Sequence, residues 1–301
     1  MLSKPHICVC VCTFERPEYL RRLLEKLEGQ CTGELFDYSI VIVDNDASQS
    51  ARSIVDAFRQ KAKIPCRYFV EPKQNISLAR NKAIENARGE FVAFIDDDEF
   101  PEERWLLHLT DALARYNADG VLGPVSPAYD EQPPKWVLRG RFFERATHPT
   151  GYVLSWENTR TGNVLLKSQV FAPDREWFDP AFGSGGEDRD FFRRKIDKGM
   201  TFVWCNEAPV FETIPSIRWN RTVLLKRALL RGKMALNSRA PRFKSILVSL
   251  LAVGVYTALL PVFLLVGYHV FMKYLIKTCD HLGKLCAFVG IDLVKEKYVR
   301  S

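Results

Sequence analysis

The sequence predicts an α/β fold in which a mostly parallel central sheet is flanked by helices. Three observations lead to this prediction. Short apolar runs alternate with helical patterns four times in the first 116 residues, the connections between them are short, and polar residues follow the apolar runs directly. This alternation is typical of a parallel sheet with right-handed crossovers. With 301 residues, the chain can form one large domain of this class and an additional segment.

The first two strand-and-helix pairs lie before residue 63. Residues 7–12, ICVCVC, are apolar on both faces, as expected for a central parallel strand. A helix over 17–27 begins at a proline and carries four leucines at helical spacing. The second buried strand, 39–44, is followed by a predicted helix over 47–62.

The next two pairs complete the regular part of the pattern. A strand over 66–70 precedes a helix over 77–88, and Gly89 is expected to cap that helix at its C-terminus. The apolar run 91–95, FVAFI, predicts a fourth buried strand, and a helix over 101–116 is expected after it.

After residue 117 the pattern is less regular. Strands are predicted at 121–125, 161–167 and 201–205, and the last of these is expected to be the final strand. Residues 126–150 are rich in proline and aromatic residues, and we expect them to form a loop over the site.

Four consecutive carboxylates, Asp96 to Glu99, follow the fourth predicted strand. Such acids repel one another unless a cation or a helix N-terminus compensates their charge. At the carboxyl end of a central strand they lie where open α/β sheets bind ligands. Asp96 and Asp98 can point to one side, which predicts an oxygen site for Mg²⁺ or Mn²⁺ carrying a diphosphate. The alternative is that Asp98 and Glu99 cap the helix over 101–116.

Other polar residues follow the first two strands. Thr13 and Arg16 come after the first strand, and Asp44 to Asp46 end the second. Under a parallel topology they converge on the same rim as the acidic run. Neither GxGxxG nor GxxxxGK[ST] occurs in the sequence, which disfavours a dinucleotide-binding Rossmann fold or a P-loop. A nucleotide is therefore expected to be held by side chains and a metal ion.

A second group of acids follows a glycine-rich turn. Gly183, Gly185 and Gly186 precede Glu187 and Asp188, which start a predicted helix. Acids at a helix N-terminus are ordinary partners of the helix dipole. After a flexible turn that faces a metal-binding rim, one of the two is also a candidate general base.

The C-terminal part differs from the rest of the chain in charge and hydropathy. Residues 213–301 hold 15 Lys or Arg and 3 Asp or Glu, a net charge of +12, whereas residues 1–212 have a net charge of −5. Residues 245–272 contain no charged side chain, and about 20 apolar residues are enough to span a bilayer. A buried core helix is the alternative, but 28 residues is long for one. We therefore predict membrane insertion, as a kinked span or a shallow re-entrant hairpin.

These patterns give a division into three parts. Residues 1–212 are predicted to be the catalytic domain, 213–244 a basic amphipathic helix or linker, and 245–301 a hydrophobic, membrane-associated helical region. The eight cysteines form no CxxC pair, which argues against a zinc site. Small buried thiols in a reducing cytosol are the simplest interpretation.

Five segments occur in order within about residues 7–210: VCTFERPEYLRRLLEKL, VIVDND, NISLARNKAIENARGEFVAFIDDDE, TGNVLLK and GGEDRDFFRRKIDKG. Together they resemble the inverting family 2 glycosyltransferases, which have the GT-A fold. The most similar members are the short bacterial enzymes that build exopolysaccharide or cell-surface glycan, including succinoglycan-type glucosyltransferases.

The resemblance implies a role for each matching residue. Asp188 would be the catalytic base that activates the acceptor, and Asp96 and Asp98 would bind a divalent cation, Mn²⁺ or Mg²⁺. Asn45 replaces the second acid of a pair that reads the nucleotide base, and an amide can still donate and accept there. The implied nucleotide-binding set comprises Thr13, Arg16, Asp44, Asn45, Arg80, Asp96 and Asp97.

The implied activity is the inverting transfer of one sugar from a nucleotide-sugar, expected to be a UDP-sugar, to a hydroxyl of a glycan or polyisoprenoid-linked acceptor. The QxxRW signature of processive members is incomplete, because Pro215 stands where glutamine is expected before Arg218-Trp219. This indicates one sugar per encounter. With the apolar segment, the resemblance implies an enzyme at the cytoplasmic membrane, with membrane lipid as a partner and the catalytic domain facing the cytoplasm.

Two other functions remain open. A membrane-anchored, non-catalytic nucleotide- or glycan-binding module would not need Asp188 as a base. A Mg²⁺-dependent phosphotransferase or nucleotidyltransferase could use the same acids, although no phosphate-binding glycine loop is present. Nucleic-acid binding is not expected, because the basic residues border an apolar segment and are not interleaved with exposed aromatic residues.

Overall fold

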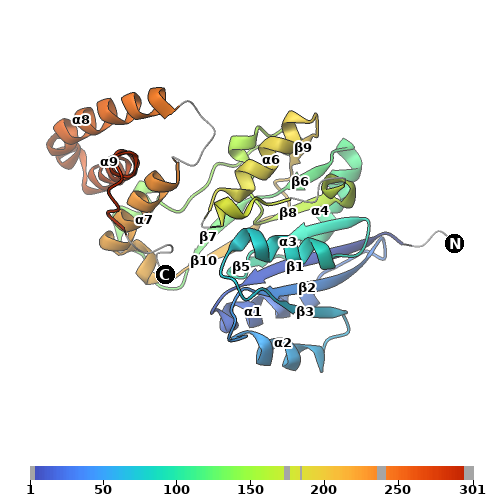
Figure 1. Cartoon of the computed structure of the whole chain (residues 1–301). Coiled ribbons are helices and arrows are strands. Elements are labelled where there is room, and N and C mark those ends of the chain that lie inside the picture. Colours follow the sequence, from blue (N-terminus) through green and yellow to red (C-terminus); the bar gives the residue numbers. More distant parts are fainter. Residues whose placement is uncertain (1–3, 173–176, 184, 236–241, 295–301) are drawn as a thin grey trace. The chain divides into compact units, whose positions relative to one another are not determined.

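The computed structural model describes residues 4–172, 177–183, 185–235 and 242–294 of the chain. The chain forms two compact units (Figure 1). The first combines Met1–Pro127 with Arg145–Thr213, and the second combines Ala128–Glu144 with Ile214–Ser301. All residues from Ile214 onward belong to the second unit, and this boundary is close to the predicted end of the catalytic domain at 212. The three-part domain division itself remains a prediction.

The first unit is built on a seven-stranded sheet with the strand order β3-β2-β1-β4-β8-β6-β9. Neighbouring strands β3, β2, β1 and β4 are parallel, β8 is antiparallel to β4 and β6, and β9 is parallel to β6. The predicted mostly parallel sheet is therefore confirmed. Its strands are β1 (His6–Thr13), β2 (Asp37–Asp44), β3 (Cys66–Val70), β4 (Phe91–Phe94), β6 (Gly120–Leu122), β8 (Val164–Lys167) and β9 (Phe202–Trp204).

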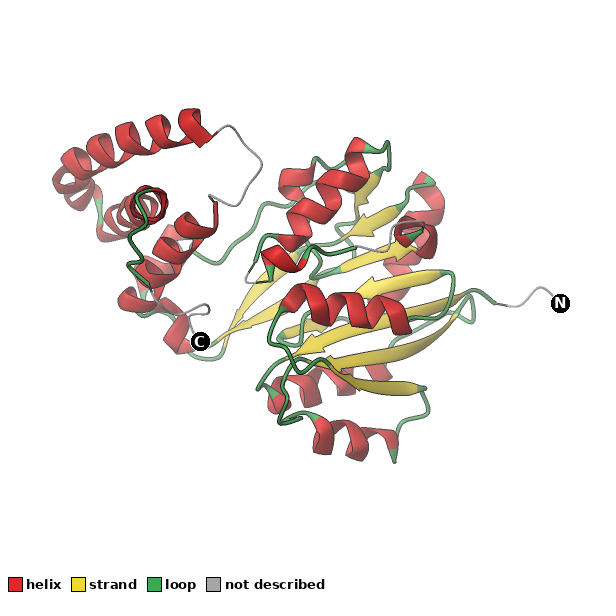
Figure 2. Cartoon of the chain, viewed as in Figure 1, coloured by secondary structure: helices red, strands yellow, loops and turns green. Residues whose placement is uncertain are grey.

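Helices cover both faces of this sheet (Figure 2). Ile7, Val9 and Val11 of β1 pack in one hydrophobic cluster with the buried residues of α1 and α4, whereas Cys8 and Cys10 pack in a second cluster with those of α3 and α6. Successive side chains of a strand point to opposite faces, so an apolar run with two buried faces forms a central strand. The helices are α1 (Pro17–Glu28), α2 (Arg52–Arg59), α3 (Ile76–Asn86), α4 (Trp105–Tyr116) and α6 (Glu187–Asp197).

The helix predicted over 101–116 begins later than expected. Residues Glu99–Pro101 form strand β5, and α4 starts at Trp105 after Arg104, which makes no side-chain capping hydrogen bond. Asp98 and Glu99 therefore do not cap this helix, and the capping interpretation of the acidic run is wrong. The helix predicted over 47–62 is also shorter, because α2 covers only Arg52–Arg59.

A second sheet accounts for two further differences. It has the strand order β5-β10-β7, with β7 at Val125–Tyr129 and β10 at Val210–Ile214. The expected loop over 126–150 therefore contains most of a strand, as well as the short helix α5 (Lys135–Gly140), and 201–205 is not the final strand. Pro127 lies inside β7, and a proline argues against a strand in a sequence pattern. Proline is nevertheless tolerated on an edge strand such as β7.

The sequence suggested Gly89 as the C-cap of α3, and this prediction is wrong. The C-cap of α3 is Ala87, two residues earlier. Gly89 has φ +127°, and a Cβ atom there would lie 2.4 Å from the backbone oxygen of His6. The glycine is needed because the chain passes against the backbone of β1 at this point.

The second unit is helical. Its main helices are α7 (Arg221–Met234), α8 (Arg242–Val266) and α9 (Tyr268–Phe288). α9 packs against both α7 and α8, and against α5. Within the part of the chain that the structure describes, Phe243–Val266 is the one helix that is long and apolar enough to cross a membrane.

Candidate active site

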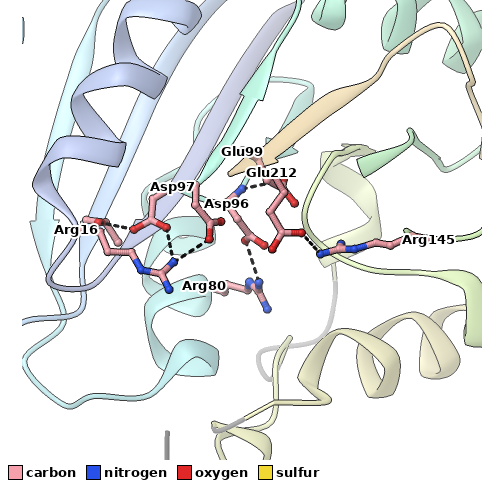
Figure 3. A network of polar contacts seen from close by, with 9 residues as sticks. Arg16, Arg80, Asp96, Asp97, Glu99, Arg145 and Glu212 are labelled. Carbon is pink, nitrogen blue, oxygen red and sulfur yellow. Dashed lines mark hydrogen bonds and ion pairs between the residues drawn. The ribbon is translucent and has the colours of Figure 1, made fainter. Parts of the chain in front are cut away.

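The acidic run lies at the carboxyl end of β4, at the centre of the large sheet. Asp97, Asp98 and Glu99 are buried, whereas the side chain of Asp96 is 46% exposed. Burial and the neighbouring Asp98 carboxylate raise the pKa of Asp97 to about 7, and burial raises the pKa of Glu99 well above its ordinary value. Figure 3 shows that arginines approach this run from several directions.

Arg16 is one of these arginines. Its Nη1 lies 3.2 Å from Oδ1 of Asp97 and 3.1 Å from Oδ2 of Asp98. Thr13, the last residue of β1, donates its hydroxyl to Oδ2 of Asp97 at 2.7 Å. The structure shows that Thr13 and Arg16 hold Asp97 and Asp98 by hydrogen bonds. Their contact with a nucleotide remains a prediction.

Arg80, on α3, connects the acidic run to the N-terminus of α6. Its side chain is buried, Nη2 lies 3.3 Å from Oδ1 of Asp96, and Nη1 donates to Oε1 of Glu187. The guanidinium also lies 5.8 Å from the ring centroid of Phe178. The Arg80 guanidinium therefore joins the acidic run after β4 to the acidic residues at the start of α6.

Glu187 and Asp188 occupy the first turn of α6 but differ in their surroundings. Glu187 is buried, and burial raises its pKa to about 7 although Arg80 lowers it. Asp188 is half-buried, and its Oδ1 accepts a hydrogen bond from the backbone N–H of Arg189 at 2.7 Å. Among the described residues, none donates a hydrogen bond to Oε2 of Glu187. The turn before the helix requires glycine, since Gly186 has φ +93°.

Asn75 fixes the start of α3 against the turn that leads to α6. Its Oδ1 accepts from the backbone N–H groups of Ser77 and Leu78, which caps α3, and its Nδ2 donates to the backbone oxygen of Pro180 at 3.0 Å. A Cβ atom on Gly183 would lie 2.1 Å from Nδ2 of Asn75. This close packing sets the positions of the helices that carry Arg80 and Glu187.

Three residues on the other side of the acidic run were not found by sequence reasoning. Arg145 pairs with Glu212, and both act electrostatically on Glu99. A Cβ atom on Gly162 would lie 2.6 Å from Oε1 of Glu99 and 3.0 Å from Oδ2 of Asp96. Arg145 and Glu212 are 67 positions apart, so no local pattern links them. Gly162 lies in the TGNVLLK segment, whose sequence predicts a strand and a family resemblance but no close packing against the acids.

Arg160 is a cation of the site that forms no ion pair with any of the described residues. Its electrostatic neighbours are Arg145, Glu99, Asp188 and Arg189. Burial and the repulsion from Arg145 lower the pKa of Arg160 to about 10. A guanidinium held near other arginines without an ion pair is suited to bind an anionic substrate group.

Asp44 and Asn45 lie at the carboxyl end of β2, and their side chains form hydrogen bonds with other residues of the protein. Asp44 is fully buried, and its Oδ2 accepts from the Tyr68 hydroxyl at 2.8 Å and the Ala51 N–H at 2.9 Å. The Asn45 amide donates to two backbone oxygens and accepts from one backbone N–H in the loop over 71–75. Both residues therefore shape the loops of the rim. Their contact with a nucleotide base remains a prediction.

The described residues include no group of three or more His, Cys, Asp or Glu side chains that could hold a metal ion. Mg²⁺ is commonly bound by one or two carboxylates together with substrate phosphates, and it does not require a complete protein cage. Asp96 and Asp98 offer hard oxygen ligands, and half-exposed Asp96 is accessible from solvent. The donor chemistry of these two residues therefore fits a divalent cation that is bound jointly with a diphosphate.

Comparison with known families identifies the class of this site. Residues 8–172, more than half of the chain, match the family model described as Glycosyl transferase family 2. The chain belongs to glycosyl transferase family 2. This confirms the family predicted from the sequence, and it removes the support for a nucleotidyltransferase or a non-catalytic binding module.

Relatives in family 2 act in glycan synthesis. Over 232 residues the chain is 36% identical to the succinoglycan biosynthesis protein ExoM of Rhizobium meliloti (strain 1021), covering 76% of this chain and 73% of that protein. Over 236 residues it is 26% identical to the glucosyl-dolichyl phosphate glucuronosyltransferase of Haloferax volcanii, covering 77% and 69%. The chain is a glycosyltransferase of exopolysaccharide or glycan biosynthesis.

Solved structures confirm the GT-A fold. S. aureus TarS 1-349 in complex with UDP aligns with a TM-score of 0.54 and 18% identity, covering 78% of this chain and 67% of that chain. The same protein in complex with UDP-GlcNAc aligns with a TM-score of 0.55 and 16% identity, covering 96% and 95%. At this level of identity the likeness concerns the fold alone.

Proposed function

We propose that this family 2 glycosyltransferase transfers one sugar, with inversion, from a UDP-sugar to a hydroxyl of a glycan or polyisoprenoid-linked acceptor. One observation carries this proposal. Arg80 binds Asp96 of the acidic run and Glu187 of the α6 N-terminus at once, which brings the predicted donor and acceptor groups into one network. A transferase needs both groups beside the same substrate carbon.

The donor is held by the acidic run and the residues around it. Asp96 and Asp98 would hold a divalent cation, Mn²⁺ or Mg²⁺, which supplies Lewis-acid neutralisation of the leaving diphosphate when it is bound. Arg16 and Thr13 keep Asp97 and Asp98 oriented by direct hydrogen bonds. This arrangement fixes the geometry of the acids before the donor binds, which lowers the reorganisation needed during the reaction.

Arg160 is proposed to bind an anionic group of the substrates. It has no ion pair among the described residues and lies in the electrostatic range of Asp188. A guanidinium can bind a phosphate through two parallel N–H donors. The donor diphosphate and the phosphate of a lipid-linked acceptor are the two groups of this chemistry in the proposed reaction.

Asp188 is proposed to remove the proton from the acceptor hydroxyl. Glu187 is the less suitable base, because it is buried and bound to Arg80. Asp188 is more exposed, and only its Oδ1 receives a hydrogen bond from the described residues, from the backbone N–H of Arg189. The acceptor oxygen then attacks the anomeric carbon as the bond to the diphosphate breaks. A single displacement inverts that carbon.

The enzyme is proposed to work at the cytoplasmic face of a membrane. The apolar helix α8 supports membrane association. All eight cysteines are free, as expected in a reducing compartment. A relative in Campylobacter jejuni, 31% identical over 97 residues and covering 32% of this chain, is named as a glucosyltransferase acting on an undecaprenol-linked glycan. A lipid-linked acceptor is the corresponding proposal for this chain.

The proposal is tested by a panel of sugar nucleotides, assayed for hydrolysis and transfer with Mn²⁺, Mg²⁺ or a chelator. Asp188→Asn should lower transfer by roughly 10²–10⁴-fold, as expected for removal of a positioned base, while donor binding is retained. Asp197→Asn, at the other end of α6, is the matched control and should transfer normally. Near-normal transfer by Asp188→Asn would show that the base has been assigned to the wrong residue.

A further inference from the structure

The second unit carries an apolar surface that the transfer reaction does not use. Large apolar side chains of α8 are exposed to solvent, among them Leu251 at 63%, Val255 at 53% and Leu265 at 88%. No charged residue interrupts the helix between 245 and 266. A contiguous exposed apolar surface of this kind marks an interaction site.

One side of α8 is nevertheless covered by α9. Near the turn between the helices, the rings of Phe263 and Tyr274 stack with centroids 4.0 Å apart. Towards the other end, Nδ1 of His281 lies 3.0 Å from the buried hydroxyl of Ser249. These contacts show that α9 returns antiparallel along most of α8.

α9 carries charged residues alongside the part of α8, residues 245–266, that has none. Lys273, Lys277, Asp280 and Lys284 all lie on it, and Lys284 donates to the hydroxyl of Ser245 at 3.1 Å. If α8 crossed a bilayer with this packing intact, Lys277 and Asp280, which lie between Tyr274 and His281 on α9, would be at the depth of the hydrocarbon core. Charged groups at that depth are among the most costly in membrane proteins. A membrane-spanning α8 would therefore have to separate from α9.

α9 is in turn tightly attached to α7. A Cβ atom on Gly232 of α7 would lie 1.9 Å from the backbone oxygen of Asp280, and one on Gly283 of α9 would lie 2.1 Å from that of Leu229. Arg231 donates to both carboxylate oxygens of Asp280 at 3.1 and 3.2 Å. Because α7 is itself rich in arginine and lysine, the α7–α9 pair is suited to a polar environment outside the hydrocarbon core.

We propose that α8 lies in the plane of a membrane surface and does not cross the bilayer. Its exposed face enters the acyl region of one leaflet, and α9 stays at the level of the headgroups, as in interfacial helices. Exposed Lys244, Lys273 and Lys277 suit anionic headgroups, as does the net charge of +12 over residues 213–301. This inference rests on the proposed membrane association, and it adds that the chain enters and leaves the membrane on the same side.

Labelling with a membrane-impermeant maleimide separates the two topologies. The full chain carrying His269→Cys is expressed in bacteria, and labelled peptides are identified by mass spectrometry. The position next to the α8–α9 turn should behave like exposed Cys31 of the first unit. Both should be protected in intact spheroplasts and labelled in inside-out vesicles.

Two results would overturn the in-plane topology. Labelling at position 269 from outside the spheroplasts, with Cys31 protected, would show that α8 spans the membrane. Protection of position 269 in both preparations would place the turn within the hydrocarbon. Either result would leave the proposed membrane association intact.

Vesicle flotation tests the exposed face of α8 directly. Leu251→Glu and Leu265→Glu should each lower binding to vesicles of phosphatidylglycerol and phosphatidylcholine at least tenfold. Leu35→Glu alters a leucine of the first unit that is 56% exposed, and it should bind like the unchanged protein. Undiminished binding by both α8 variants would overturn the proposed surface. Donor hydrolysis in detergent should be unchanged in all three variants, so the transferase assignment is judged separately.

Discussion

Arg80 and Glu187, 107 positions apart in the sequence, form a buried ion pair whose side chains are 8% and 6% exposed. The same guanidinium also binds Asp96, so one side chain connects the end of β4 with the start of α6. The position of each acidic group therefore depends on an arginine from a third element, α3.

Arg80→Met should destabilise the protein and abolish transfer. Removing one partner of a buried ion pair leaves the other charge uncompensated, which typically costs about 3–5 kcal/mol. The free energy of unfolding, measured by urea denaturation, should fall by this amount. Arg21→Met removes an exposed arginine that pairs with Glu18 and Glu25, and it should leave the unfolding midpoint unchanged.

The double variant Arg80→Met, Glu187→Leu separates stability from activity. Replacing both partners of a buried pair by apolar residues is often neutral, so the unfolding free energy should recover. Transfer should not recover, because Asp96 still lacks the guanidinium of Arg80 as its partner. Restored transfer in the double variant would show that Arg80 acts only on stability.

Gly162→Ala should lower transfer while leaving the large sheet intact. The added methyl would lie 2.6 Å from Oε1 of Glu99 and 3.0 Å from Oδ2 of Asp96, so at least one carboxylate must move. The value of kcat should fall by about tenfold or more, because a displacement of about 1 Å in a catalytic group can cost 10²-fold. Gly29→Ala is the control, since the nearest atom to its Cβ is 3.9 Å away. Equal kcat in both variants would contradict the proposed role of this close packing.

Asp98→Ala should weaken donor binding only when a divalent cation is present. Calorimetry with UDP should show a lower affinity in Mn²⁺ for this variant than for the unchanged protein. In a chelator the two proteins should bind UDP alike. If the Mn²⁺ dependence of the two proteins were the same, Asp98 would not be a metal ligand.

Arg160→Gln should raise KM for the substrate whose anionic group it binds. Hydrogen bonds to charged groups are worth about 1.5–3 kcal/mol, which corresponds to roughly tenfold or more in KM. Separate titrations of donor and acceptor decide whether Arg160 binds the donor diphosphate or the phosphate of a lipid-linked acceptor. Arg115→Gln, on an exposed part of α4, should leave both KM values unchanged. Unchanged KM values for Arg160→Gln would refute its role in binding.

Thiol labelling should follow burial. Cys31 is exposed and should react with a maleimide within the first phase of labelling. Cys10 is fully buried, and burial raises the pKa of its thiol well above the ordinary value, so it should react only after unfolding. Fast labelling of Cys10 in the folded protein would contradict the central position of β1.

The regular part of the fold could be predicted because its signals are local. The run over residues 7–12 is apolar on both faces, and the structure places its alternate side chains in two separate cores. The leucines of α1 have helical spacing and are all buried. In both cases a few neighbouring residues carry the whole pattern, so no knowledge of distant segments is required.

The second sheet could not be predicted because its pairing is not local. Glu99 of β5 pairs with Glu212 of β10, and neither short strand has an alternating apolar pattern of its own. The residues of the site likewise divide into those with a local sequence signal and those brought together only by folding. Asp96, Asp98 and Asp188 belong to recognisable segments, but the Arg145–Glu212 pair exists only after the chain has folded. The amide of Asn45 is engaged by the backbone of residues 71–75, and its residue type alone gives no sign of this.

The small sheet has a further property that follows from two of its residues. Its outer strands, β5 and β7, each contain a proline, Pro101 and Pro127, whereas the middle strand β10 has none. A proline lacks the N–H group that an incoming strand would need as a donor. Each outer strand therefore has one backbone donor fewer to offer an incoming strand, which disfavours edge-to-edge association of an enzyme that would be concentrated on a lipid surface.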